Sequence, residues 1–313
     1  MRLEDIGFYT LSDERAVTAS SLTPLSRCEL ILTSRCNFKC PYCRRVGGSD
    51  LDLATARRWV ETWGLMGCKA IRFSGGEPTL YPHLLDLVRL SALMGIERIA
   101  VSTNGSAKPE LYKALLEAGV NDFSISLDAC CAADAMKMGV TGSFRDLVET
   151  IRWLSEETYT TVGLVVTEEN APKVGEIIAY ASSLGVADIR VIPAAQEGIR
   201  LPGVYIPEET LVKHPILRYR LANMNSGDVV RGLTNRDAPR CGLVLDDMAA
   251  CGEEHFPCVI YMREGGQAIG KLGPELREER QKWFLAHEVK GDPICSRNCL
   301  DVCRDYNRRF AER

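Results

Sequence analysis

Short apolar runs alternate with longer amphipathic stretches along the first two thirds of the chain. The apolar runs have the length and composition of buried strands, and they fall at 28–33 (CELILT), 69–73, 97–101, 123–127, 160–166 and 187–191. Between them, apolar residues recur at helical spacing over 51–66, 81–94, 109–118, 144–157 and 171–184. Strands that alternate with helices of this length indicate βαβ units and a parallel sheet. We therefore predict an α/β fold, a partial (β/α)6 barrel, whose site lies at the carboxyl ends of the strands.

This rhythm stops after residue 195. The next part is rich in prolines and glycines, contains one predicted helix at 208–222 and is expected to connect two regions. From residue 241 cysteines and acidic pairs become frequent, a further helix is predicted at 274–287, and the charged end is expected to be solvated. The predicted organisation is a lead-in (1–27), the barrel (28–195), the connecting segment (196–240) and a cysteine-rich extension (241–313).

Composition and charge narrow the class of protein. The chain has 313 residues, of which 46% are hydrophobic and 26% charged, as in an ordinary globular protein. A net charge of −4 argues against broad affinity for nucleic acid or an anionic membrane. No apolar run approaches the roughly 20 residues that a membrane span needs, and the first residues have no signal-peptide pattern. We therefore expect a cytoplasmic protein with neither a membrane nor a nucleic-acid partner.

The cysteines distinguish this chain from an ordinary globular protein. There are 13 of them, gathered mainly in one cluster near residue 40 and another in the last quarter of the chain. In a reducing compartment, clustered thiols bind metals or carry out chemistry more often than they form disulfides. Two separate clusters suggest two metal sites.

The first cluster is Cys36-Asn-Phe-Lys-Cys40-Pro-Tyr-Cys43, directly after the first predicted strand. Three thiolates within eight residues can face one centre, and soft sulfur ligands select zinc, copper(I) or an iron–sulfur cluster. A structural zinc site would need a fourth protein ligand, and no histidine is close in the sequence. Three ligands suit a [4Fe–4S] cluster with one open iron, whereas a zinc knuckle is the alternative.

The second predicted strand is followed by Gly75-Gly76-Glu77-Pro78. Glycines allow the backbone to approach a ligand closely and a glutamate can accept hydrogen bonds from an ammonium group, although the same residues also suit a tight turn. Together with the cysteine motif, in which the aromatic Tyr42 precedes the third cysteine, this segment resembles the radical S-adenosylmethionine (SAM) superfamily over about residues 28–195. The resemblance implies that Cys36, Cys40 and Cys43 hold a [4Fe–4S] cluster and that its open iron binds SAM. One electron then cleaves SAM to a 5′-deoxyadenosyl radical, which abstracts hydrogen from a substrate.

The same resemblance implies further contacts to SAM at the strand ends. The Gly75–Pro78 segment corresponds to the edge that binds the methionine amino group. Ser102 and Asn104 follow the third strand, and Ser126 and Asp128 belong to the fourth, where relatives contact the carboxylate and ribose of the cofactor. As isolated features these residues are also typical of turns and helix caps.

The C-terminal cysteines resemble, without matching, the SPASM and twitch extensions of this superfamily. Too few of them fit the pattern for two clusters, so we expect one auxiliary [4Fe–4S] cluster with at least one cysteine to spare. Its ligands are expected among Cys241, Cys258, Cys295, Cys299 and Cys303. Two alternatives stay open, a structural zinc site and a helix face on which cysteines serve as small apolar residues.

These features predict a radical SAM enzyme distantly like the molybdenum-cofactor GTP cyclase. The expected substrate is a small molecule of the nucleotide, nucleoside or sugar class, and the expected electron donor is a flavodoxin or ferredoxin. The net reaction is left open among oxidation, lyase and isomerase chemistry, and Cys130 and Cys131 are weak candidates for a hydrogen-atom donor. The alternatives are a peptide-modifying maturase and a non-enzymatic iron–sulfur or zinc protein.

Overall fold

The fold is built around one mixed sheet of nine strands. The computed structural model describes residues 2–8, 11–44, 47–195 and 203–313, so the first part of the predicted connecting segment, 196–202, lies outside the described residues. The strand order is β6-β5-β4-β3-β2-β1-β7-β8-β9, and all neighbours from β6 to β7 are parallel. The six predicted strands are confirmed as β1 (Arg27–Thr33), β2 (Ala70–Gly75), β3 (Arg98–Thr103), β4 (Asp122–Ser126), β5 (Tyr159–Val166) and β6 (Asp188–Pro193).

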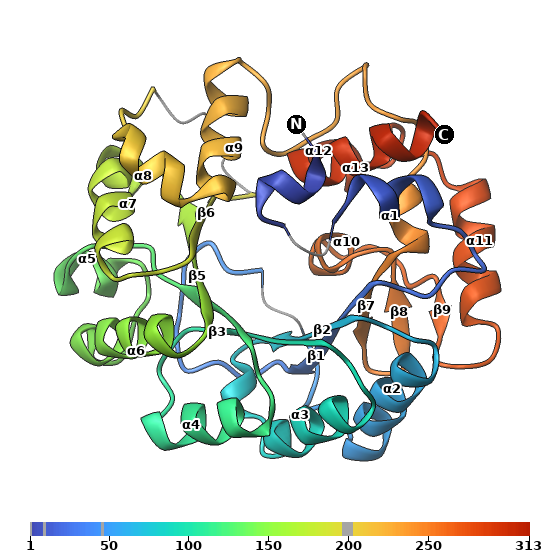
Figure 1. Cartoon of the computed structure of the whole chain (residues 1–313), viewed down its shortest axis with the longest axis horizontal. Helices are drawn as coiled ribbons and strands as arrows, with labels where there is room; N and C mark the ends of the chain where they lie inside the picture. Colours follow the sequence, from blue (N-terminus) through green and yellow to red (C-terminus); the bar gives the residue numbers. More distant parts are fainter. Residues whose placement is uncertain (1, 9–10, 45–46, 196–202) are drawn as a thin grey trace.

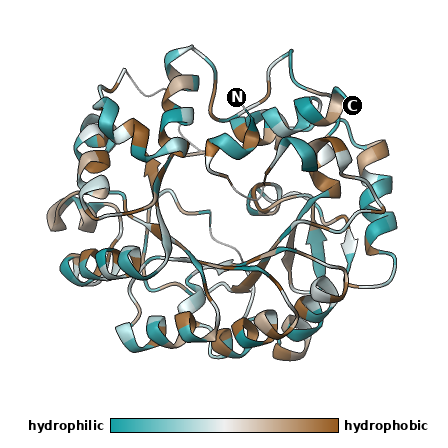
Figure 2. Cartoon of the chain, viewed as in Figure 1, coloured by the Kyte–Doolittle hydropathy of each residue, from teal (hydrophilic) through white to brown (hydrophobic). Residues whose placement is uncertain are grey.

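Helices cover the outside of this curved sheet, as Figure 1 shows. They are α2 (Leu53–Leu65), α3 (Leu84–Leu93), α4 (Pro109–Ala118), α5 (Ala132–Lys137), α6 (Phe144–Glu157) and α7 (Val174–Ser183). Their apolar faces pack on the outward side chains of the strands, such as Leu30, Ile71 and Val101, in one large core. Figure 2 shows the resulting alternation of hydrophobic and hydrophilic segments around each helix.

The inner face of the sheet is polar. In β1 the outward residues Cys28, Leu30 and Leu32 join the core, whereas Arg27 and Glu29 line a cavity inside the barrel. Side chains alternate between the two faces of a strand, so the charged positions within these otherwise apolar runs all point to the same interior. The barrel interior beside these residues therefore contains charged side chains, and Ile31 on the same face of β1 joins a small separate apolar cluster with Ala249, Phe256 and Met262.

The predicted helix at 208–222 is two helices, α8 (Glu208–Lys213) and α9 (Pro215–Asn225). The break falls at Pro215, because proline lacks an amide donor and disfavours helical backbone in the residue before it. Asp188 at the start of β6 accepts hydrogen bonds from the amides of Ile216 (2.9 Å) and Leu217 (3.3 Å). This carboxylate fixes the start of α9 against the barrel.

The C-terminal extension continues the barrel sheet. Its first strand, β7 (Asp247–Cys251), pairs in parallel with β1, and β8 (Glu254–Phe256) and β9 (Gly270–Lys271) follow in antiparallel order. The remaining elements of the extension are the 3-10 helix η4 (Gly242–Leu245), α10 (Val259–Arg263), α11 (Leu276–Ala286), α12 (Cys295–Asn298) and α13 (Asp301–Ala311). The cysteines of the extension are thereby held next to β1, whose other end carries the first cysteine motif.

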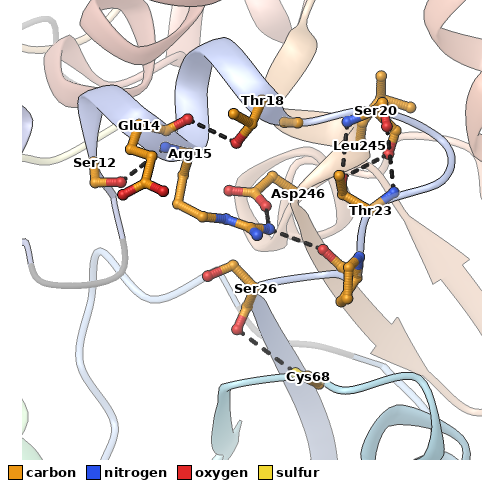
Figure 3. A network of polar contacts seen from close by, with 12 residues as sticks. Ser12, Glu14, Arg15, Thr18, Ser20, Thr23, Ser26, Cys68, Leu245 and Asp246 are labelled. Atoms are coloured by element: carbon orange, nitrogen blue, oxygen red, sulfur yellow. Dashed lines mark hydrogen bonds and ion pairs between the residues drawn. The ribbon is translucent and has the colours of Figure 1, made fainter.

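The two ends of the chain pack against each other. The N-terminal elements are a 3-10 helix, η1 (Leu3–Ile6), and α1 (Asp13–Thr18). Tyr306 and Phe310 of α13 are buried against them, so the expectation that the charged C-terminal end is solvated is wrong. Its apolar residues recur at helical spacing, and this amphipathic face outweighs the charge of the segment. Arg15 of α1 pairs with the buried Asp246 (Figure 3). Asp246 also accepts a hydrogen bond from Tyr306 (2.9 Å).

None of the helices in the described part of the chain is both long and apolar enough to cross a bilayer.

Candidate functional site

The three cysteines of the first motif line one cavity at the carboxyl ends of the barrel strands. The cavity has a volume of about 430 Å³, and Cys36, Cys40 and Cys43 form part of its wall. Cys36 and Cys43 are exposed and Cys40 is half-buried. The loop that follows this strand places all three cysteines on the wall of one cavity, on the side of the sheet where ligands of α/β folds bind.

A segment that sequence reasoning missed holds the cysteine loop in place. The carbonyl of Gly139, after α5, accepts a hydrogen bond from the amide of Lys39 (2.9 Å), and Thr141 donates to the carbonyl of Asn37. Gly139 has φ +93°, and a Cβ there would lie 2.5 Å from the amide nitrogen of Cys40. Only glycine fits this contact without strain. The segment is distant in sequence from the motif, and an isolated Gly-Val-Thr gives no local signal.

The glycines of the Gly-Gly-Glu-Pro segment serve a close approach of two backbones. The amide of Gly76 donates to the carbonyl of Thr33 (2.7 Å), and a Cβ on Gly76 would lie 2.2 Å from the carbonyl oxygen of Arg35. Gly75 and Gly76 both line the cavity, so this backbone also forms a wall on which a ligand can lie. The segment therefore locks the start of the cysteine loop.

Glu77 lies beneath this wall. Its side chain has no exposed surface, and neither Glu77 nor Pro78 lines the cavity. The carboxylate accepts hydrogen bonds from Thr79, from the hydroxyl of Thr103 (2.7 Å) and from the amide of Asn104 (2.6 Å). Burial raises the pKa of Glu77, and these hydrogen bonds oppose that rise. Glu77 thus joins the ends of β2 and β3, and its role as a cofactor ligand stays a prediction.

The other predicted strand-end residues do surround the cavity. Tyr42, Ser102, Asn104, Ser126 and Asp128 all line it. The side-chain Nδ2 of Asn104 lies 3.9 Å from the sulfur of Cys36, and the hydroxyl of Tyr42 donates to Asp128. Burial raises the pKa of Asp128 to about 6, although the hydrogen bond from Tyr42 opposes this rise. The sequence-predicted residues are therefore brought together, with Glu77 and Pro78 behind them.

The donor set of this cavity suits an iron–sulfur cluster with one open position. Burial raises the pKa of the Cys36 thiol, and it raises that of Cys40 to about 11. Such thiols lose their protons when a metal binds, so binding is coupled to proton release. Three sulfurs on one wall, with glycine backbone and polar side chains on the others, leave room for a ligand that is not protein.

A second cavity, of about 300 Å³, lies on the other side of the barrel interior. Its wall includes five cysteines from four segments, namely Cys241, Cys258, Cys295, Cys299 and Cys303. Burial raises the pKa of all five thiols, that of Cys258 to about 12. Cys251 instead borders a separate cleft beside Gly252, so the structure separates it from the five.

These five cysteines do not share one helix face. Cys295 begins α12, Cys299 follows it, and Cys303 lies in the next helix, α13. His287 and Asp292 are close by, and their ligand atoms lie within 4.8 Å of one another and of the sulfur of Cys295. The five cysteines of the cavity, with His287 and Asp292 beside Cys295, thus offer more donors than one metal centre needs.

The two cavities adjoin each other. Ser102, Ile192, Arg231 and Ile260 line both of them. A molecule placed between the two groups of cysteines would therefore contact both sites.

Cys130 and Cys131 lie apart from this arrangement. Cys131 caps the start of α5, is exposed, and donates to Asp134 (3.3 Å). Cys130 packs against the core, and neither residue lines either cavity. The hydrogen-donor role predicted for them has no support from this placement.

Comparisons with known sequences agree with the motifs. Residues 30–181 match the family model described as the radical SAM superfamily. The GTP 3',8-cyclase of Chlorobaculum tepidum is 36% identical over 104 residues, which is 32% of this chain and 32% of that protein. The GTP 3',8-cyclase of Pelotomaculum thermopropionicum is 31% identical over 189 residues, 56% of this chain and 58% of that protein. The matches thus span about a third to three fifths of these curated relatives.

Solved structures share the fold over most of the chain. Streptococcus suis SuiB bound to precursor peptide SuiA aligns with a TM-score of 0.60 at 12% identity, over 90% of this chain and 76% of that one. The structure of anSMEcpe with bound AdoMet aligns with a TM-score of 0.59 at 15% identity, over 92% of both chains. At these identities the likeness concerns the fold alone. The barrel, the cysteine cavity and the family match over residues 30–181 show a radical SAM domain, and enzymes of that superfamily use a [4Fe–4S] cluster and SAM.

Proposed function

We propose that the protein abstracts hydrogen from a small molecule of the nucleotide, nucleoside or sugar class, which binds between a SAM-binding cluster and an auxiliary cluster. The observation that carries this proposal is the shared wall of the two cysteine-lined cavities. A substrate at that wall would lie within reach of both sites.

In this proposal Cys36, Cys40 and Cys43 hold the first [4Fe–4S] cluster. When bound, the cluster and SAM together supply a radical that can remove hydrogen from an unactivated carbon. The protein orients SAM and excludes water from the cavity. The Gly75–Gly76 backbone and the side chains of Asn104 and Ser126 orient SAM, while apolar residues of the same cavity, such as Phe38, Leu127 and Val140, exclude water.

Four of the five C-terminal cysteines hold the auxiliary [4Fe–4S] cluster in this proposal, and one is spare. Iron–sulfur clusters accept single electrons. A cluster here would suit removal of an electron from the substrate after hydrogen abstraction, and direct ligation of substrate is the second possibility. The thiols are half-buried, and these surroundings suit either role because they limit the access of water to the centre.

The small-molecule class is supported by the curated relatives, which are GTP 3',8-cyclases over the matched part. The second candidate is peptide modification. It is favoured by one observation, that SuiB bound to precursor peptide SuiA shares the fold over 90% of this chain. The two candidate functions differ in the substrate, a small molecule or a peptide, that binds at the shared wall of the two cavities.

The test is SAM cleavage by anaerobically reconstituted protein, supplied with dithionite or with flavodoxin or ferredoxin. We expect 5′-deoxyadenosine to form, and to form faster with a member of a nucleotide, nucleoside and sugar-phosphate panel than with a peptide library. The Cys36→Ala/Cys40→Ala/Cys43→Ala variant is the control and should form none. Protein that contains iron but cleaves no SAM would overturn the proposal, and stimulation by peptides alone would favour the second candidate.

A further inference from the structure

Arg231 lies at the junction of the two cysteine-lined cavities and lines both of them. Its backbone is fixed to the C-terminal cysteine segment, because the amide of Gly232 donates to the carbonyl of Cys299 (2.9 Å) and that of Asp301 donates to Val230 (3.0 Å). Its side chain extends to the barrel, where Nε donates a hydrogen bond to the carbonyl of Pro193 at the end of β6 (2.8 Å). The guanidinium is thereby held at a fixed place between the sites.

Among the residues that the structure describes, the Arg231 guanidinium has no acidic partner. Within the described ranges of the chain, no carboxylate oxygen lies within 4.0 Å of it. Four other arginines of the cavity that the C-terminal cysteines line are neutralised in ion pairs: Arg27 with Asp247, Arg72 with Asp122, Arg220 with Asp301, and Arg304 with Asp237. A half-buried cation that is left without a counter-charge is costly, unless a ligand supplies the charge.

Arg263 is a second arginine of this kind. It lines the SAM-side cavity with Arg231. Within the described part of the chain its guanidinium donates only to carbonyl oxygens, those of Arg44 (3.1 Å) and Gly75 (2.9 Å). A third arginine, Arg44, lines the same cavity and pairs with Glu264 (2.9 Å). The arginine cluster (Arg44, Arg231 and Arg263) thus contains three cations and one carboxylate.

We propose that Arg231 and Arg263 bind a phosphate or pyrophosphate group of the substrate. The inference rests on the proposed function, since it assigns one end of the molecule that lies at the shared wall. Guanidinium groups present paired donors that match phosphate oxygens. The two positive charges of Arg231 and Arg263 are balanced better by the two negative charges of a phosphate than by the single negative charge of a carboxylate ligand. The substrate class is therefore narrowed to phosphorylated small molecules, such as nucleotides or sugar phosphates.

The test is calorimetric titration of SAM-saturated, anaerobically reconstituted protein with inorganic pyrophosphate and with inorganic phosphate. Saturation with SAM keeps its own carboxylate from being the anion that is measured. The variants are Arg231→Gln and Arg263→Gln, and the matched control is Arg57→Gln, which removes the same charge from an exposed pair on α2. Iron content and 5′-deoxyadenosine formation are measured on each wild-type preparation, and iron content on each variant.

We expect wild-type and Arg57→Gln protein to bind pyrophosphate equally, and each cavity variant to bind it about tenfold or more weakly with unchanged iron content. Equal weakening in all three variants would show a general charge effect and overturn the inference, as would loss of binding together with loss of iron. Wild-type protein that cleaves SAM but binds neither probe refutes the phosphate site and leaves the proposed function standing. Wild-type protein that binds pyrophosphate through Arg231 but cleaves no SAM refutes the proposed function and retains the phosphate site.

Discussion

Replacing Glu77 by glutamine separates a structural role of this residue from a cofactor role. In the wild type one carboxylate oxygen accepts from Thr79 and Thr103, and the other accepts from the amide of Asn104 (2.6 Å). Glutamine keeps the shape but has only one acceptor oxygen. If that oxygen serves the threonines, its NH₂ group faces the Asn104 amide, and a buried donor is left without an acceptor.

The size of the effect follows from these contacts. An unsatisfied buried donor costs about 1–3 kcal/mol, and loss of charged hydrogen bonds adds to it, while relief of the buried charge offsets a part. We expect the free energy of unfolding to fall by about 2–4 kcal/mol. A chain of this length has an unfolding entropy of about 0.66 kcal/mol/K, so Tm should fall by about 3–6 °C.

The assay is thermal unfolding followed by circular dichroism, with SAM affinity measured on the same preparations. The control is Glu117→Gln, an exposed position on α4 where we expect no change in Tm. An unchanged Tm for Glu77→Gln would refute this reasoning. If SAM binding were lost while Tm was unchanged, Glu77 would be a cofactor ligand, as the family resemblance implies.

Three further predictions concern other parts of the molecule. Gly139→Ala should destabilise the protein by about 2 kcal/mol or more and lower its iron content, because the new methyl group meets the Cys40 loop at a positive φ. Gly142→Ala, where a Cβ meets nothing within 4 Å, is the control, and equal iron in both would contradict the explanation. Cys258→Ala should lower the iron content, measured with a ferrozine assay, whereas Cys251→Ala should leave it unchanged; equal loss would place Cys251 in the centre. Burial raises the pKa of Asp188 to about 6 from 3.8, so the folded state binds this proton more tightly and stability is lost as pH rises through 6. Between pH 4 and 7, the free energy of unfolding measured by urea titration should fall by about 2–3 kcal/mol less in Asp188→Asn than in the wild type. The same pH dependence of the free energy of unfolding in both proteins would contradict this prediction.

The barrel could be predicted because its signals are local. Buried parallel strands such as β2 and β5 are short apolar runs, and the stretches between them have helical periodicity. The first cysteine cavity could be predicted for the same reason, since Cys36, Cys40 and Cys43 belong to one loop after one strand. The order of strands along the chain then placed Ser102, Asn104 and Asp128 at the same end of the barrel.

Features that depend on distant contacts could not be predicted. The strand β7 is a short Asp-Met-Ala-Ala-Cys segment that becomes a strand by pairing with β1, and nothing in its composition indicates this. Gly139 and Arg231 act through contacts with Cys40 and Pro193, which are far from them in the sequence. The helical spacing of apolar residues in α13 is a local signal, but the surface that buries this face comes from the opposite end of the chain, so its burial could not be predicted.

The central claim is that the two groups of cysteines hold two iron–sulfur clusters. The most direct test is iron and sulfide content, with EPR spectra, of anaerobically reconstituted wild type and of the Cys36→Ala/Cys40→Ala/Cys43→Ala variant. We expect about eight irons in the wild type and about four in the variant, with the auxiliary signal retained. About four irons in the wild type, with zinc bound at the site of Cys295 and its neighbours His287 and Asp292, would contradict it.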